Sequence, residues 1–194
     1  MNGVVMRLLA AVVFALSSVA ASAQVVEIEG VKLDPTAQVG GATLQLNGAG
    51  IRTRAIFKVY VAGLYVPAKA NTAAALLAQK GPRRVAITML RNVDADTFSG
   101  ALSEGLQKNL SEAQFTGFKA QIDTLSANFK AAGEAKKGDV IHLEFVPDAG
   151  TRVVVNGKAS GIAIAGEDFY AALLRIWLGD KPVDADLKKG MLGS

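Results

Sequence analysis

The stretch from Leu46 to Val66 (LNGAGIRTRAIFKVYVAGLYV) places the strongest limits on how this chain can fold. It opens with Gly48-Ala49-Gly50, and because glycine tolerates positive φ, this tripeptide predicts a tight turn or a close approach of two backbones. β-branched and aromatic residues then dominate Ile56 to Val66, which predicts a buried strand. Arg52 and Arg54 stand at the mouth of this apolar run, where a buried cation is costly unless an anion meets it. The stretch therefore predicts a central strand beside a cationic site.

Strand and helix patterns continue along the rest of the chain. Alternating or β-branched residues, bounded by turn signals, predict strands within Val25 to Leu33 and at Thr43 to Leu46, Arg83 to Leu90, Asp139 to Val146, Thr151 to Asn156 and Ile162 to Ile164. Capping residues and apolar stripes predict a short helix at Thr72 to Gln79 capped by Asn71, a helix capped by Asp94, a helix from the Ser111/Gln114 capping box to Gly133, and helices at Glu167 to Leu178 and Asp184 to Met191. This order predicts an α+β fold, a mostly antiparallel sheet with helices packed on one side.

The N-terminal residues are typical of a secretory signal peptide. Arg7 precedes an apolar run from Leu8 to Val19, and Ala21-Ser22-Ala23 fits a cleavage site. An uncleaved anchor is the alternative, but the run is shorter than the ~20 residues of a membrane span. We therefore expect residues 1–23 to be removed, residues 24–194 to form one domain with no stable membrane span, and the protein to be exported to a bacterial periplasm.

Composition excludes several classes of site. The sequence has no cysteine, so no disulfide, thiolate nucleophile or thiolate-bound metal exists. Basic residues occur in scattered pairs and the net charge is only +4, which argues against a nucleic-acid partner. The single histidine, His142, alternates with Ile141 and Leu143 and is expected to face solvent together with Glu144. The residues therefore predict no metal site, no cofactor and no Ser-His-Asp triad.

Three segments resemble the chalcone isomerase family, in the family's order. They are NGAGIR, FKVYVAGLYV and FYAALLRIWLGDKPVDADLKKGMLG, and the resemblance extends over about Glu27 to Gly193. It implies an open-faced β-sandwich with a ligand cleft between sheet and helices.

The resemblance implies two polar ligand-binding residues. Arg52 falls where the family's functional arginine follows its Gly-rich corner, and its planar fork suits a carboxylate or enolate. A surface arginine or a structural ion pair is the alternative. Arg54 has the same chemistry and a weaker positional match. Tyr60 lies where the enzymes carry threonine and the fatty-acid-binding branch carries tyrosine, although it is also a candidate core tyrosine. Eight residues of continuous strand would separate Arg52 from Tyr60 by ~26 Å, so they share a ligand only if the chain bends or the arginine side chain reaches back across the sheet.

Three positions depart from the plant enzymes. Phe98 replaces a helix tyrosine, Gly105 an asparagine and Ile176 a threonine near the end of the C-terminal helix. Cyclisation of a chalcone requires donors that hold a phenolate and polarise a ketone, and these three side chains donate nothing. They make the implied cleft more apolar, so we expect Phe98 and Ile176 to contact a ligand and no residue to be catalytic.

An arginine at the inner end of an apolar cleft suits a long-chain carboxylate. The sequence therefore favours an exported, non-catalytic protein that binds a fatty acid or a similar amphiphile. Two alternatives stay open: an intramolecular lyase (isomerase) acting on an unsaturated ketone through Arg52 and Tyr60, and an envelope scaffold that uses the fold only to bind a protein partner.

Overall fold

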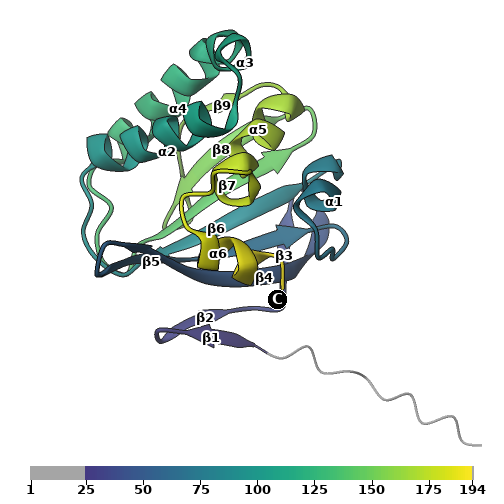
Figure 1. Ribbon diagram of the computed structural model, residues 1–194, viewed down its shortest axis with the longest axis vertical. Helices are drawn as coiled ribbons and strands as arrows, with labels where there is room; N and C mark the ends of the chain where they lie inside the picture. Colours follow the sequence, from purple (N-terminus) through teal and green to yellow (C-terminus); the bar gives the residue numbers. More distant parts are fainter. Residues whose placement is uncertain (1–24, 194) are drawn as a thin grey trace, which may run out of the picture.

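A seven-stranded antiparallel sheet forms the centre of the protein in a computed structural model that describes residues 25–193 (Figure 1). The predicted signal peptide therefore lies outside the described residues. The strand order β3-β4-β5-β6-β7-β8-β9 follows the chain, so each strand pairs with the next. A separate hairpin, β1-β2, precedes the sheet. The strands are β1 (Val26–Ile28), β2 (Val31–Leu33), β3 (Thr36–Val39), β4 (Ala42–Arg54), β5 (Phe57–Val66), β6 (Arg83–Met89), β7 (Val140–Val146), β8 (Gly150–Val155) and β9 (Lys158–Ile164).

Six helices are described, and the larger ones cover one face of the sheet (Figure 1). They are α1 (Ala73–Ala78), α2 (Ala95–Asn109), α3 (Glu112–Gly117), α4 (Lys119–Ala132), α5 (Glu167–Leu178) and α6 (Ala185–Met191). Helix α1 connects β5 to β6, α2 to α4 connect β6 to β7, and α5 and α6 follow the last strand. The predicted α+β class, with helices packed on one side, is confirmed.

Strand β5 is buried on both faces, because it lies near the middle of the sheet. From Tyr60 to Val66 every residue is buried. Tyr60, Ala62 and Leu64 belong to the core under the helices, whereas Val61 and Tyr65 belong to a second core on the opposite face. The alternation of strand side chains thus assigns one run of apolar residues to two cores.

The β1-β2 hairpin covers part of the second face. Leu33 of β2 is buried there, with Ile28 and Val31 packed at its side. The Tyr65 hydroxyl donates to the Asp34 carbonyl oxygen at 2.9 Å, which fastens the segment after the hairpin to the sheet. Tyr65 is a packing residue of the second core, and this face of the open sandwich is partly closed by a strand pair.

Gly48-Ala49-Gly50 lies within β4 and is not the turn that one interpretation predicted. The strand continues through it with a register shift between Leu46 and Gly48. A Cβ added at Gly48 would lie 2.1 Å from the Gly190 carbonyl oxygen, and one at Gly50 3.2 Å from Leu187 Cα. The glycines therefore let α6 pack directly on the strand, which was the other predicted use.

The chain turns instead at Ala55-Ile56, between β4 and β5. Arg54 pairs with Phe57 across this two-residue loop, and Arg52 pairs with Tyr60. The large separation expected of a continuous strand is therefore wrong, because the two residues lie opposite each other on paired strands. This hairpin brings the two predicted polar residues together.

Other boundaries differ from the predictions in small ways. The N-cap of α1 is Thr72, whose hydroxyl accepts from Ala75 N, and not Asn71. Ser111 forms the predicted capping box, but the helix that it starts ends at Gly117 and a new one begins after Phe118. Glu144 was expected to face solvent and is buried, and an ion pair with Arg84 at 2.6 Å offsets the cost of burying its charge.

Candidate functional site

A cavity of about 820 Å³ opens between the β4-β5 hairpin and helices α2 and α5. Its buried residues are almost all apolar: Tyr60, Phe98, Leu102, Gly105 and Ile176. The exposed residues around them are mostly polar or charged. The cavity therefore has an apolar interior and a polar rim, which is the arrangement that an amphiphilic molecule requires.

The rim carries more positive than negative side chains. Five of the lining residues are cations and three are acids; the cations are Arg52, Arg54, Arg91, Lys108 and Lys181, and the acids are Asp94, Glu104 and Glu134. Lys108, and more weakly Arg54 and Arg52, lower the pKa of Glu104 from its ordinary value. The balance of charge favours an anionic group at the rim.

Arg52 is half-buried, with 21% of its side chain exposed. Its Nη1 lies 3.8 Å from Asp184 Oδ2 and also donates to the Thr53 carbonyl oxygen. Among the described residues, the guanidinium makes no other hydrogen bond, so most of its five N–H donors can serve a ligand. The side chain is near the rim of the apolar interior and not at its innermost end.

Asp184 is the anion that meets Arg52 in this structure, and its carboxylate is already satisfied by backbone. Its Oδ2 accepts from Thr53 N at 2.9 Å, and its Oδ1 accepts from Asp186 N and Leu187 N as the N-cap of α6. The ion pair with Arg52 is long by comparison. The sequence predicted Asp184 only as the start of a helix. Its contact with Arg52 could not be predicted, because only the fold brings Asp184 beside β4.

The Tyr60 hydroxyl is buried and accepts a hydrogen bond from Trp177 Nε1 at 3.1 Å. Burial raises the pKa of Tyr60 to about 12, while the hydrogen bond and the charge of Arg52 act in the opposite direction. The phenol is therefore neutral at physiological pH and retains its proton as a donor. No acceptor for that proton occurs among the described residues, which leaves it available to a ligand.

Phe98 and Ile176 form the apolar interior together with Tyr60. The Phe98 ring lies 6.4 Å from the Tyr60 ring and 5.0 Å from the Phe129 ring, measured between centroids. Ile176 is fully buried. Arg54, the fifth predicted residue, is exposed on the rim. All five predicted residues thus line one cavity, and their role in ligand binding stays a prediction.

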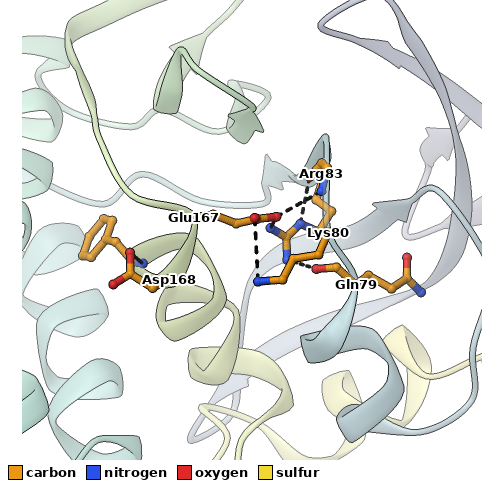
Figure 2. Close-up of polar contacts among 7 residues, drawn as sticks. Gln79, Lys80, Arg83, Glu167 and Asp168 are labelled. Carbon is orange, nitrogen blue, oxygen red and sulfur yellow. Dashed lines mark hydrogen bonds and ion pairs between the residues drawn. The ribbon is translucent and has the colours of Figure 1, made fainter.

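Arg83 is a fully buried cation that does not line this cavity, and each of its three guanidinium nitrogens donates a hydrogen bond within the protein (Figure 2). Its Nη2 donates to Glu167 Oε1 at 2.7 Å, its Nη1 to the Gln79 carbonyl oxygen and its Nε to that of Gly81. The rings of Phe145 and Tyr170 each lie 5.3 Å from the guanidinium carbon. Burial lowers the pKa of Arg83, and the Tyr170 and Glu167 charges oppose that shift. This cluster joins β6 to the start of α5 and is structural.

Comparison with known proteins identifies the family. The profile of the chalcone isomerase-like family matches residues 25–193. The chain belongs to the chalcone isomerase-like family. A search of the curated proteins finds no match.

A solved structure has the same fold. A fatty-acid binding protein of Arabidopsis thaliana (AtFAP1) superposes with a TM-score of 0.65 over 87% of this chain and 96% of the other, with 14% of the residues identical. At this identity the likeness establishes the chalcone isomerase-like fold alone. The resemblance drawn from the three sequence segments is therefore confirmed at the level of family and fold.

Two of the three departures from the plant enzymes, Gly105 on α2 and Ile176 on α5, are in contact. A Cβ added at Gly105 would lie 2.9 Å from Ile176 Cγ2 and 3.4 Å from Val183 Cγ1. Ile176 therefore occupies the space that an asparagine at position 105 would need. Gly105 and Ile176 therefore depend on each other: the isoleucine fits because position 105 has no side chain. Neither residue brings a polar group to this wall of the cavity.

Within residues 25–193 no group of three or more metal-ligating side chains of the His, Cys, Asp and Glu types is found. No helix in the same range is long and apolar enough to cross a bilayer.

Proposed function

We propose that this protein binds a fatty acid or a similar amphiphilic carboxylate in the cavity beside the β4-β5 hairpin, without catalysing a reaction. The observation that carries the proposal is the pairing of Arg52, at the rim of the cavity, with Tyr60, in its apolar interior. The guanidinium supplies charge-assisted donors and the phenol one neutral donor, so together they match a carboxylate. AtFAP1, which shares the fold, is described as a fatty-acid binding protein, and this supports the choice of ligand class.

The expected free-energy contributions to binding support a reversible complex. A dozen-carbon chain gains on the order of 8 kcal/mol at ~0.8 kcal/mol per buried methylene. Hydrogen bonds to the charged arginine add about 1.5–3 kcal/mol. Association opposes this by roughly 4–15 kcal/mol, towards the lower end for a cavity that already exists. Dissociation constants in the micromolar range follow.

The test is to identify what the purified protein carries. The parent, Arg52→Ala and a charge control, Lys158→Ala, are extracted with organic solvent, and bound lipids are identified by mass spectrometry. Lys158 is exposed on β9, so its loss changes the net charge equally without touching the cavity. We expect near-stoichiometric fatty acid on the parent and on Lys158→Ala, and little on Arg52→Ala. Protein free of lipid in all three variants, even after incubation with fatty acid, would contradict the proposal and favour a scaffold role.

A second candidate is an intramolecular lyase acting on an unsaturated ketone. The same pairing favours it, because Arg52 and the Tyr60 hydroxyl are two donors that can polarise one carbonyl oxygen. The aliphatic wall at Gly105 and Ile176 argues against the plant reaction, since it offers no group to hold a phenolate. Stereoselective cyclisation of naringenin chalcone that is lost in Arg52→Ala would establish this candidate in place of the binder.

We also propose that the protein acts outside the cytoplasm, as the signal-peptide pattern of residues 1–23 indicates. Expression of the full chain in a Gram-negative host, followed by osmotic release and N-terminal sequencing, tests this. Periplasmic protein beginning near Gln24 is the expected result. Uncleaved protein in the cytoplasm would contradict it.

A further inference from the structure

The tip of the β4-β5 hairpin presents two adjacent apolar side chains to solvent. Ile56 is 85% exposed and Phe57 is 52% exposed. They are two of only five large apolar residues that are exposed within residues 25–193. Loop tips usually carry small or polar residues, so an isoleucine followed by a phenylalanine at this place requires an explanation.

The geometry of the turn does not explain these residues. A two-residue hairpin loop favours Asn-Gly or another glycine-containing pair, because at least one central residue adopts positive φ. Here Ala55 adopts a φ of 54°, and Ile56 completes the loop. Neither residue is a preferred turn former, and Ile56 does not pack against either hydrophobic core.

Basic side chains surround the apolar tip. Arg54 is exposed beside it, and the Arg91 guanidinium carbon lies 4.5 Å above the Phe57 ring. Lys58 follows on β5, where Glu29 offsets its charge through an ion pair at 2.8 Å. The tip therefore combines exposed apolar surface with positive charge from two arginines that form no ion pair among the described residues, which is the combination that anionic lipid surfaces bind.

The tip is continuous with the cavity. Ala55, Phe57 and Arg91 belong to its lining, together with Arg54. A surface that contacted the tip would therefore also face the mouth of the cavity, through which an amphiphile must pass.

We propose that the β4-β5 hairpin tip docks the protein on an anionic lipid bilayer, with Ile56 and Phe57 inserted among the headgroups and Arg54 and Arg91 on the lipid phosphates. Docking places the cavity mouth at the lipid surface, so that an amphiphile moves between bilayer and protein without crossing water. This inference rests on the proposed function for its purpose, but the docking itself is measured independently of ligand binding.

The test is flotation of the purified protein with vesicles of one part phosphatidylglycerol to three parts phosphatidylcholine. Ile56→Ser removes the exposed apolar side chain at the tip. Ile162→Ser is the matched control, because Ile162 is 70% exposed on β9, outside the cavity lining, and only its backbone is held by Asn128. We expect vesicle binding to fall by about tenfold or more in Ile56→Ser and to stay at the parent level in Ile162→Ser. Binding to pure phosphatidylcholine vesicles, or in high salt, is expected to be weaker for the parent.

Three results would overturn docking: no flotation of the parent, equal flotation of the parent and Ile56→Ser, or a change of oligomeric state in Ile56→Ser without vesicles, which would make the tip an interface between copies. Titration of the same variants with a water-soluble short-chain fatty acid separates the two proposals. Undiminished titration in Ile56→Ser with lost flotation supports both docking and binding. Titration that fails in the parent while flotation persists refutes the binding proposal alone.

Discussion

Two arginines of this protein show how burial and partners distinguish a structural cation from a binding one. Arg83 is fully buried, and its guanidinium contacts two backbone carbonyls, a carboxylate and two aromatic rings. Arg52 is half-buried, has a distant carboxylate partner and lines a cavity. The sequence singled out Arg52 through a family resemblance. It gave no sign that Arg83 would be buried, because its partner Glu167 is 84 residues away.

The ion pair between Arg83 and Glu167 is expected to hold the start of α5 against strand β6. Glu167→Ala leaves a buried guanidinium without its counter-ion and should lower the free energy of unfolding by about 3 kcal/mol, measured by urea denaturation. Lys80→Ala is the control, because Lys80 lies 3.7 Å from the same carboxylate but is exposed, and it should change stability by less than about 1 kcal/mol. Equal effects of the two substitutions would show that Arg83 does not depend on the pair.

The elements that the sequence predicted best are those with local signals. The Asp94 cap, the Ser111 capping box and the apolar stripe of α5 depend on neighbouring residues, and all three appear where expected. The β4-β5 turn was missed because Ala55-Ile56 carries no turn signal, whereas Gly48-Ala49-Gly50 carries one and lies inside a strand. Glycine there serves a contact with α6, more than 130 residues later in the chain, that no local pattern encodes.

Gly48→Ala tests that contact between elements. Its Cβ would meet the backbone of Gly190 and Gly193, which cannot move as a flexible side chain can. We expect α6 to be displaced and the free energy of unfolding to fall by about 1–3 kcal/mol, with faster amide exchange in α6. Gly100→Ala is the matched control: its Cβ meets nothing within 4 Å, and it should stabilise α2 by up to about 1 kcal/mol. Unchanged exchange in α6 of Gly48→Ala would contradict close packing.

Over the whole molecule, one sheet separates two cores, and the sequence predicted this arrangement in part. The mix of strands and amphipathic helices predicted the α+β class, and the apolar run in β5 predicted a buried strand, which the structure buries on both faces. The cavity itself was implied only by the family resemblance, because its lining comes from segments between Arg52 and Val183 that no periodicity connects. All five predicted site residues nevertheless line it.

The three tyrosines report on the integrity of both cores. Burial raises the pKa of Tyr60 and Tyr65 to about 12 and raises that of Tyr170 further. Since the folded state holds these protons more tightly than the unfolded state, stability is complete below pH 10 and is lost as the pH rises towards 12. The preferential ionisation of Tyr60 in the unfolded state should by itself lower the free energy of unfolding by about 1.4 kcal/mol at one pH unit above the pKa of the unfolded state.

Phenolate absorbance during an alkaline titration measures this directly, with circular dichroism as the check on folding. We expect almost no phenolate at pH 10 while the protein is folded, and half-ionisation at pH 10 in a denaturant. Half-ionisation of any tyrosine near pH 10 in the folded protein would mean that its hydroxyl is open to water.

Calorimetric titration with dodecanoate and with dodecanol tests the central claim most directly, because the two ligands share a chain and differ only in the head group. If Arg52 binds the carboxylate at the rim of an apolar cavity, the parent should bind dodecanoate about ten- to a hundredfold more tightly than dodecanol. Arg52→Ala should bind both with the same affinity. Equal affinities in the parent, or a preference for dodecanoate that survives in Arg52→Ala, would contradict the account.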